Sequence, residues 1–178
     1  MGRFGRGRKP AALPDEVFAG LELAPRDRVM AFGIDTATGG YAVLTRHRVV
    51  LVAPTGWLGF SRPWHDVASG GWDPVTGTIS VAWADGGRSA MLTFGQGHDD
   101  LADVFRERVQ ASVVTSDQVL LDDDEGPASA GRVSLRKNLA TEELLVQVKL
   151  NRGVRRSDPD VAAALERAVA DLWEQVGR

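Results

Sequence analysis

The sequence predicts an α+β protein in which seven antiparallel strands and a closing helix precede a smaller unit made of a β-hairpin and a second helix. Between Val29 and Phe94, turn signals recur at a spacing of roughly 8 to 12 residues, which is typical of an antiparallel sandwich or barrel and not of βαβ units. At Asp99 the hydrophobic period changes from two residues to that of a helix. After Ser112 the chain alternates again and then ends in another amphipathic stretch.

Seven short segments alternate or are apolar between turn signals, and each predicts a strand. They are Val29–Ile34, Tyr41–Arg46, Arg48–Ala53, Trp57–Trp64, Val67–Trp72, Thr78–Ala84 and Arg88–Phe94. The sixth alternates best, with Ile79, Val81 and Trp83 on one face, so we expect Trp83 in the core. Asp85-Gly86 is a strong hairpin signal after it. We expect these strands to form a seven-stranded antiparallel barrel or a pair of packed sheets.

A helix is predicted from Asp99 to about Ala111. One helical stripe of apolar residues runs along it, at Leu101, Val104, Phe105 and Val109. Asp99 and Asp100 suit a helix start, through capping and through the helix dipole. Such a helix would close one open end of the barrel.

The remaining residues, 113–178, predict a second unit with ββα order. Val113–Leu121 is expected to be extended, and Asp122–Pro127 reads as an acidic loop. Arg132–Asn138 and Leu144–Leu150 alternate and should form a hairpin, and Asp158-Pro159 opens a helix that ends before Gly177. The chain thus divides into a flexible basic tail (1–12), a first domain (13–112) and this C-terminal unit (113–178).

Composition excludes several classes of function. The chain of 178 residues has no cysteine, which rules out disulfides and thiolate chemistry, and its net charge of -3 implies no partner by itself. The longest apolar runs, such as Val49–Ala53, are far too short to cross a bilayer. No hydrophobic segment follows the basic N-terminus, so no secretory signal is indicated and a cytoplasmic protein is expected.

The segment Tyr41–Ala53, YAVLTRHRVVLVA, resembles the second and third strands of bacterial pleckstrin-homology-like (PH-like) and GRAM-like domains. In these domains a Leu-Thr-x-x-Arg pattern bridges two apolar strands, and Leu44, Thr45 and Arg48 stand at those places. The resemblance covers about residues 28 to 112. It implies a PH-like barrel capped by a helix, and a binding role, for lipid head groups, peptides or proteins, more often than catalysis.

The chain also resembles a group of short actinobacterial proteins that share its C-terminal end, and this likeness implies no activity. Their common features match Asp158, Pro159, Val161 and Gly177. One departure from lipid-binding PH domains concerns the loop after the first strand, which here reads DTATGG and has an acid but no base. A phosphoinositide site of the usual kind is therefore not expected.

No segment carries a complete catalytic, nucleotide or metal motif, so we expect no enzyme, no cofactor and no metal. Gly95-Gln96-Gly97 imitates the start of a dinucleotide fingerprint, but Asp100 stands where its third glycine would be. The histidines have no zinc-site spacing, and His65-Asp66 near Ser61 lacks a nucleophile elbow.

Two features indicate binding. Trp57 begins a strand after a turn, which makes it the tryptophan most expected to be exposed and a candidate for partner binding. Basic residues concentrate in the C-terminal unit, and the candidates for anion binding are Arg132, Arg136, Lys149, Arg152, Arg155 and Arg156. If the apolar residues of the hairpin face the helix, then Arg132, Arg136 and Lys149 share the opposite, exposed face.

These observations leave two interpretations open. The first is a non-catalytic PH-like adaptor that binds a protein partner. The second is a nucleic-acid or ribosome-associated protein that uses the basic tail and the hairpin face to hold a polyanion. No aromatic residues are interleaved with the bases of the hairpin, so base stacking is not indicated.

Overall fold

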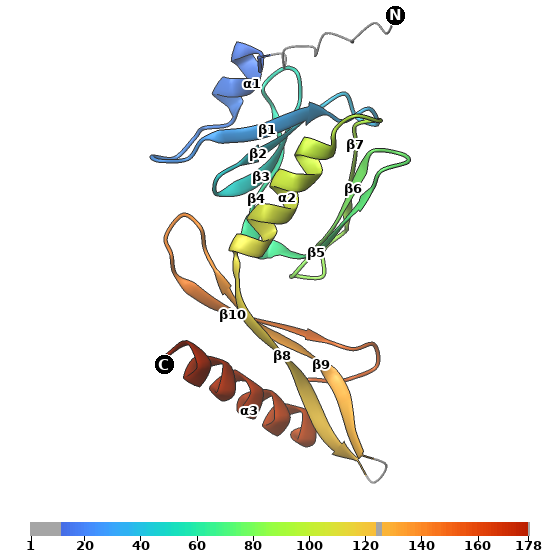
Figure 1. Ribbon diagram of the computed structural model, residues 1–178, viewed down its shortest axis with the longest axis vertical. Coiled ribbons are helices and arrows are strands. Elements are labelled where there is room, and N and C mark those ends of the chain that lie inside the picture. The colour runs from blue at the N-terminus through green and yellow to red at the C-terminus, as the bar shows by residue number, and fades with distance from the viewer. Residues whose placement is uncertain (1–11, 124–125, 178) are drawn as a thin grey trace, which may run out of the picture.

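The computed structural model describes residues 12–123 and 126–177, and it has two parts joined end to end (Figure 1). The N-terminal part holds seven strands and the helix α2, and the C-terminal part is a sheet with one long helix on one face. The elements are α1 (Asp15–Gly20), β1 (Val29–Ile34), β2 (Tyr41–Thr45), β3 (Arg48–Val52), β4 (Leu58–Pro63), the 3-10 turn η1 (Trp64–Asp66), β5 (Val67–Asp73), β6 (Thr78–Trp83), β7 (Ala90–Thr93), α2 (Asp99–Ala111), β8 (Val113–Asp123), β9 (Gly126–Lys137), β10 (Leu144–Leu150) and α3 (Pro159–Val176).

The seven strands of the N-terminal part form two antiparallel sheets. One has the order β1-β2-β3-β4 and the other the order β5-β6-β7. Over the described residues these sheets are not joined into one closed barrel, so the fold is α+β with three separate sheets in all. Every strand expected from the turn spacing is present, with small shifts at its ends, and so is the helix that begins at Asp99.

One hydrophobic core holds the two sheets and α2 together. Its buried residues come from both sheets, from η1 and from α2: Ala42, Leu44, Val49, Trp64, Val67, Ile79, Val81, Trp83, Leu92, Phe94, Leu101 and Phe105. Trp83 is 8% exposed and packs edge-on against Phe60, with ring centroids 5.6 Å apart. The prediction that Trp83 is a core residue is confirmed. On the other face of the first sheet, Val17 of α1 and Leu21, which follows the helix, are buried.

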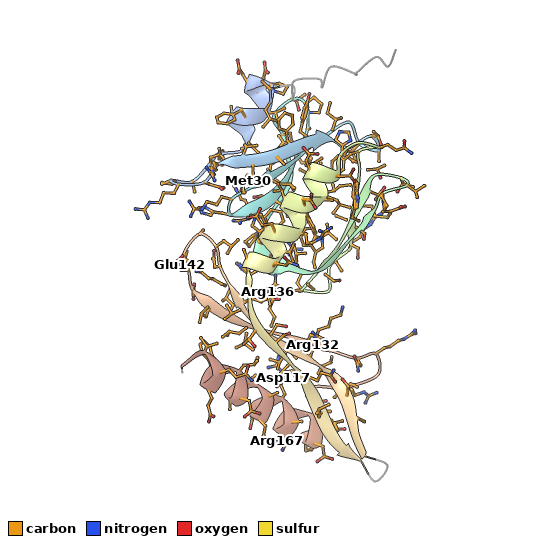
Figure 2. All side chains as sticks on the ribbon, in the orientation of Figure 1. Met30, Asp117, Arg132, Arg136, Glu142 and Arg167 are labelled. Carbon is orange, nitrogen blue, oxygen red and sulfur yellow. The ribbon has the colours of Figure 1, made fainter. Side chains whose placement is uncertain are left out.

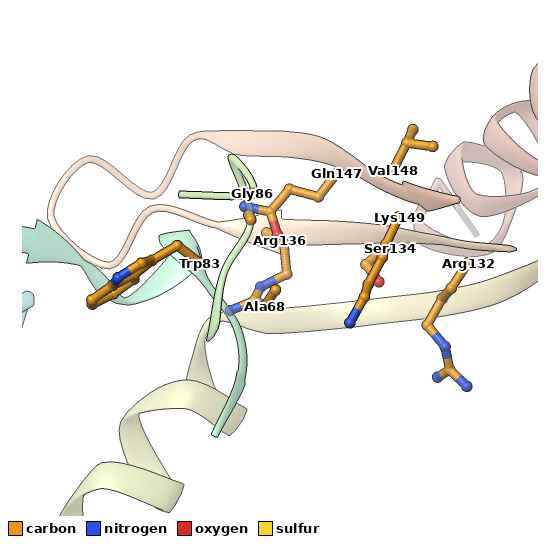
Figure 3. Close-up of a pocket in the computed structure, with 10 residues that line it drawn as sticks. Ala68, Trp83, Gly86, Arg132, Ser134, Arg136, Gln147, Val148 and Lys149 are labelled. Carbon is orange, nitrogen blue, oxygen red and sulfur yellow. The ribbon is translucent and has the colours of Figure 1, made fainter. Parts of the chain in front are cut away.

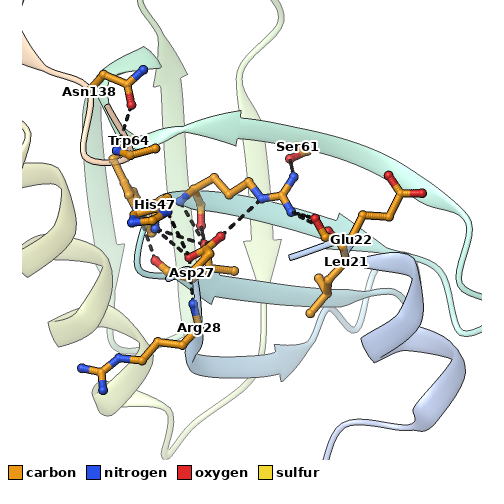
Figure 4. A network of polar contacts seen from close by, with 11 residues as sticks. Leu21, Glu22, Asp27, Arg28, His47, Ser61, Trp64 and Asn138 are labelled. Atoms are coloured by element: carbon orange, nitrogen blue, oxygen red, sulfur yellow. Dashed lines mark hydrogen bonds and ion pairs between the residues drawn. The ribbon is translucent and has the colours of Figure 1, made fainter. Parts of the chain in front are cut away.

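Thr45 and Arg48 of the Leu-Thr-x-x-Arg motif belong to a structural network centred on Asp27, whose side chain is almost fully buried (Figure 4). The Thr45 hydroxyl donates to the Asp27 carboxylate at 3.0 Å, and Arg48 Nε lies 3.6 Å from the same group. Arg48 also donates to the Ser61 hydroxyl at 2.9 Å and to the Glu22 carbonyl at 3.0 Å. A buried carboxylate is tolerated only when it is paired. Because the partners of Asp27 are Thr45 and Arg48, the pairing holds the segment before β1 against the β2–β3 turn.

The C-terminal part differs from the expected ββα unit. Its sheet has the order β10-β9-β8, so the extended segment after α2 is a third strand, and the unit is βββα. The expectation of a flexible acidic loop from Asp122 to Pro127 is wrong where the structure describes it, because β8 reaches Asp123 and β9 begins at Gly126. The antiparallel pairing satisfies backbone groups that a loop would leave to solvent.

The helix α3 covers one face of this sheet (Figure 1). Asp158 caps it as expected, with its carboxylate accepting from the Asp160 backbone N–H at 3.0 Å. The shared core contains Val119, Ala130, Val133, Leu135, Ala164, Leu165, Ala168 and Leu172. Because side chains alternate along a strand, the residues of β9 and β10 on the opposite face of the sheet are not covered by α3.

Candidate functional site

Alternation along β9 and β10 determines which side chains lie opposite α3. Arg132 and Lys149 are paired directly across the two strands, as are Ser134 and Gln147. Because residues two apart in a strand share a face, Arg132, Ser134 and Arg136 lie on one side. Figure 3 shows the side chains of Arg132 and Lys149 projecting toward the same side of the sheet. The polar face predicted from the sequence is thus present.

This polar face meets β5 and the end of β6 in a concave surface, which we call the junction cleft. Its smaller hollow has a volume of about 160 Å³ and is lined by Ala68, Trp83, Ala84, Gly86, Arg132, Ser134, Arg136, Gln147, Val148 and Lys149 (Figure 3). A neighbouring hollow of about 410 Å³ is lined by Ala68, Ser69, Gln118, Ser129, Gly131, Arg132, Lys149 and Asn151. Ala68, Arg132 and Lys149 line both, so the two hollows are adjacent, and we treat them as two parts of the junction cleft.

The lining of the junction cleft is cationic. Among the residues that the structure describes, none that lines the two hollows is acidic. Arg132 donates from Nη1 to the Ser116 hydroxyl at 3.4 Å, which is a neutral acceptor. Within the described ranges, neither Arg132 nor Lys149 has an ion-pair partner. Their charges therefore face the cleft without a carboxylate to neutralise them.

The expectation that Arg136 lies on the exposed face of the hairpin is wrong, because its side chain is only 3% exposed. Figure 2 places it between the two parts of the molecule, with Arg132 farther along the sheet. Its guanidinium donates to the Val67 and Trp64 carbonyls, each at 3.0 Å, and to the Ser112 hydroxyl at 2.6 Å. The N-terminal part covers this end of the polar face, which alternation within a strand does not reveal.

The environment of Arg136 is unusual for a buried cation. All three of its hydrogen-bond acceptors are neutral, and its Nε is buried without a partner among the described residues. Burial lowers the pKa of Arg136 below its ordinary value, and the carboxylate of Asp66 partly opposes that shift. The positive charge beneath the junction cleft is thus incompletely compensated.

The other basic candidates are not gathered at the junction cleft. Arg152 and Arg155 are exposed in the connection between β10 and α3. Arg156 lines a different hollow, on the α3 side of the sheet, together with Val146 and Leu165. Residues 1–11 of the basic tail lie outside the described residues. Of the six candidates, the structure brings together Arg132, Lys149 and the buried Arg136.

Trp57 is exposed, as the sequence predicts, with 70% of its surface accessible. It lies in the turn between β3 and β4, which packs against α1 at Gly20 and Gly56. It does not line the junction cleft. Its role in partner binding stays a prediction.

Sequence reasoning missed the neutral polar residues of the junction cleft. Ser134 and Gln147 follow from the same alternation that places Arg132, and Gln118 follows from its pairing with Arg132 across β8 and β9. On the opposite wall, residues such as Ala68 and Gly86 have no polar side chain, so no sequence pattern indicates that they belong to a site. They are brought to the site by the packing of the two parts.

His65 lies at this junction, and it predicts a pH dependence of stability. Its backbone carbonyl accepts from the Gln147 side chain, and its side chain is mostly buried, with Nε2 3.7 Å from Asp66 Oδ1. Burial is the main cause that lowers its pKa below 6.5; Arg136 lowers it further, whereas Asp66 and Glu143 oppose the shift. The unfolded state therefore takes up the proton first as the pH falls.

We expect the free energy of unfolding to decrease as the pH falls below about 6.5, until the folded-state pKa is passed and the decrease levels off. Urea denaturation between pH 7.5 and 5 measures this slope. His65→Gln should make the slope shallower across that range. An identical slope in the wild type and in His65→Gln would contradict the assignment.

In the part of the chain that the structure describes, no group of three or more His, Asp or Glu side chains is placed to hold a metal ion. None of its helices combines the length and the apolar character needed to span a membrane. The chain matches no protein-family model and no curated protein.

Proposed function

We propose that this chain is a non-catalytic binding protein that recognises an acidic segment of a protein partner in the junction cleft. The observation that carries the proposal is the cross-strand pair of Arg132 and Lys149, which lines both hollows of a cleft where none of the described lining residues is acidic. Like charges placed opposite each other in a sheet destabilise it unless solvent or an anion screens them. An anionic ligand would relieve this repulsion and gain charge-assisted hydrogen bonds.

We also propose that the N-terminal part is a PH-like domain. Four antiparallel strands, three antiparallel strands and a C-terminal helix follow one another in the order that this family has, and Leu44, Thr45 and Arg48 stand at the positions of its motif. Domains of this kind serve chiefly as binding modules, which agrees with a binding role for the whole chain. The sheets do not close over the described residues, and the packing through α2 takes the place of closure.

A nucleic acid is the competing ligand for a cationic cleft, and the lining favours a peptide. Of the described residues that line the cleft, Trp83 is the aromatic one, and it is 8% exposed. The guanidinium of Arg62 lies over its ring, 4.7 Å from the centroid. No aromatic face is therefore open for bases to stack on, whereas single-strand binders depend on such stacking.

Titration of a glutamate-rich peptide tests this function, because the chain supplies a matched pair of variants. Arg132→Gln with Lys149→Gln removes the charges of the junction cleft, and Arg152→Gln with Arg155→Gln removes the same number of charges outside it. We expect saturable binding that the first double variant weakens about tenfold or more, since each charge-assisted hydrogen bond contributes about 1.5 to 3 kcal/mol. The second double variant should bind like the wild type.

Fluorescence anisotropy with the labelled peptide, at low and at physiological salt, measures this difference. Equal weakening by both double variants would show nonspecific attraction to net charge and would contradict the proposal. A single-stranded oligonucleotide bound more tightly than the peptide, with a steep salt dependence, would favour the nucleic-acid interpretation.

A further inference from the structure

We infer that the junction cleft is a site for one phosphate monoester group, carried on a serine or threonine of the protein partner. This inference rests on the proposed function, because it specifies the anion within the same site. Three observations carry it: the number of positive charges at the smaller hollow, the incompletely compensated charge of Arg136, and the division of the cleft into a small and a larger hollow.

The smaller hollow gathers more positive charge than one carboxylate would balance. Arg132, Arg136 and Lys149 all line it, and no acid of the described part of the chain does. A phosphate monoester carries a charge of about -1.5 to -2 near neutral pH and has three strong acceptor oxygens. Ser134 and Gln147, which line the same hollow, add neutral hydrogen-bonding groups beside the cations. Its chemistry thus suits a dianion with several acceptors better than a single carboxylate.

The buried positive charge of Arg136 attracts the anion electrostatically, without a direct contact. The guanidinium is buried, its hydrogen-bond acceptors within the described residues are neutral oxygens, and Asp66 is the acid whose charge supports it. Asp66 is shared with Arg62, whose Nε lies 3.4 Å from Asp66 Oδ2. In a poorly solvated setting, an uncompensated charge acts strongly on an anion nearby. Arg132 and Lys149 are exposed and supply the direct contacts.

The shape of the junction cleft matches a phosphorylated side chain on a peptide. The hollow of about 160 Å³ suits one small group, and the adjacent hollow of about 410 Å³ offers room for the flanking chain. Gln118, Ser129 and Asn151 line the larger hollow with amide and hydroxyl groups, which suit peptide N–H and C=O groups. The shared Arg132 and Lys149 place the anion at the boundary between the two.

Isothermal titration calorimetry with a pair of peptides tests the inference. The probes are acetyl-Ala-Ala-phosphoserine-Ala-Ala-amide and the same peptide with glutamate in place of phosphoserine. We expect the phosphoserine peptide to bind at least about tenfold more tightly. Its affinity should rise between pH 5 and 7, as the phosphate loses its second proton near pH 6, whereas the glutamate peptide should not show this rise.

Variants locate the site. Arg132→Gln with Lys149→Gln should remove the preference for phosphoserine, and Arg152→Gln with Arg155→Gln should keep it. If the glutamate peptide binds as tightly as the phosphoserine peptide, and both depend on Arg132 and Lys149, the phosphate inference is overturned while the proposed function stands. If neither peptide binds, the phosphate inference fails, and the titration with the glutamate-rich peptide decides separately whether the proposed function stands. Inorganic phosphate bound as tightly as the phosphoserine peptide would overturn the protein-borne source of the group.

Discussion

Arg136→Ala is expected to lower the free energy of unfolding by about 3 to 5 kcal/mol, because it removes the buried cation that joins the two parts of the molecule. The substitution would leave the Trp64 and Val67 carbonyls and the Ser112 hydroxyl without their charged donor. Each buried polar atom left unpaired costs about 1 to 3 kcal/mol. The lost volume at a side chain that is 3% exposed adds a cavity.

Arg132→Ala is a matched control for this prediction, since Arg132 belongs to the same face of the same strand but is exposed. Urea denaturation should show a change within about 0.5 kcal/mol for Arg132→Ala. Limited proteolysis near Ser112 should accelerate in Arg136→Ala, because the connection between α2 and β8 loses its buried contacts. Equal destabilisation by the two variants would show that Arg136 does not join the parts.

The strands and helices were predictable because each rests on a local pattern. Strand alternation and turn residues identified all seven strands before α2, and the stripe through Leu101 and Phe105 identified α2 itself. The pairing of β8 with β9 was not predictable from local pattern, because the acidic run where β8 ends resembles a loop and hides the continuation of the strand. Whether seven strands close into one barrel or divide into two sheets is likewise a property of tertiary packing.

The candidate site was predictable where it depends on alternation within a strand, and not where it depends on tertiary packing. Alternation placed Arg132 and Lys149 on the face opposite α3, and the structure pairs them directly. It also placed Arg136 there, but the N-terminal part covers that end of the face, so the side chain became a buried link between the parts. The cleft exists only because two separate segments, around Ala68 and around Lys149, come together. No sequence pattern within either segment predicts that the two come into contact.

The second large effect is expected at Trp64, which belongs to both the core and the junction. Its side chain is fully buried, its indole N–H donates to the Thr45 carbonyl at 3.0 Å, and its ring packs edge-on against Phe105 with centroids 5.6 Å apart. Its backbone carbonyl accepts from Arg136. Trp64→Ala should therefore lower the free energy of unfolding by about 3 to 5 kcal/mol, the usual cost of deleting a large buried aromatic side chain.

Trp57→Ala is the control for Trp64→Ala, because Trp57 is 70% exposed and the loss of its side chain opens no cavity. We expect its free energy of unfolding to stay within about 0.5 kcal/mol of the wild-type value. Trp64→Phe separates two contributions, since phenylalanine keeps most of the packing but leaves the Thr45 carbonyl without the indole donor. It should fall between the wild type and Trp64→Ala in urea denaturation. A similar midpoint for Trp64→Ala and Trp57→Ala would mean that Trp64 is not held in the core. The contact through which α2, η1 and Arg136 meet would then have to lie elsewhere.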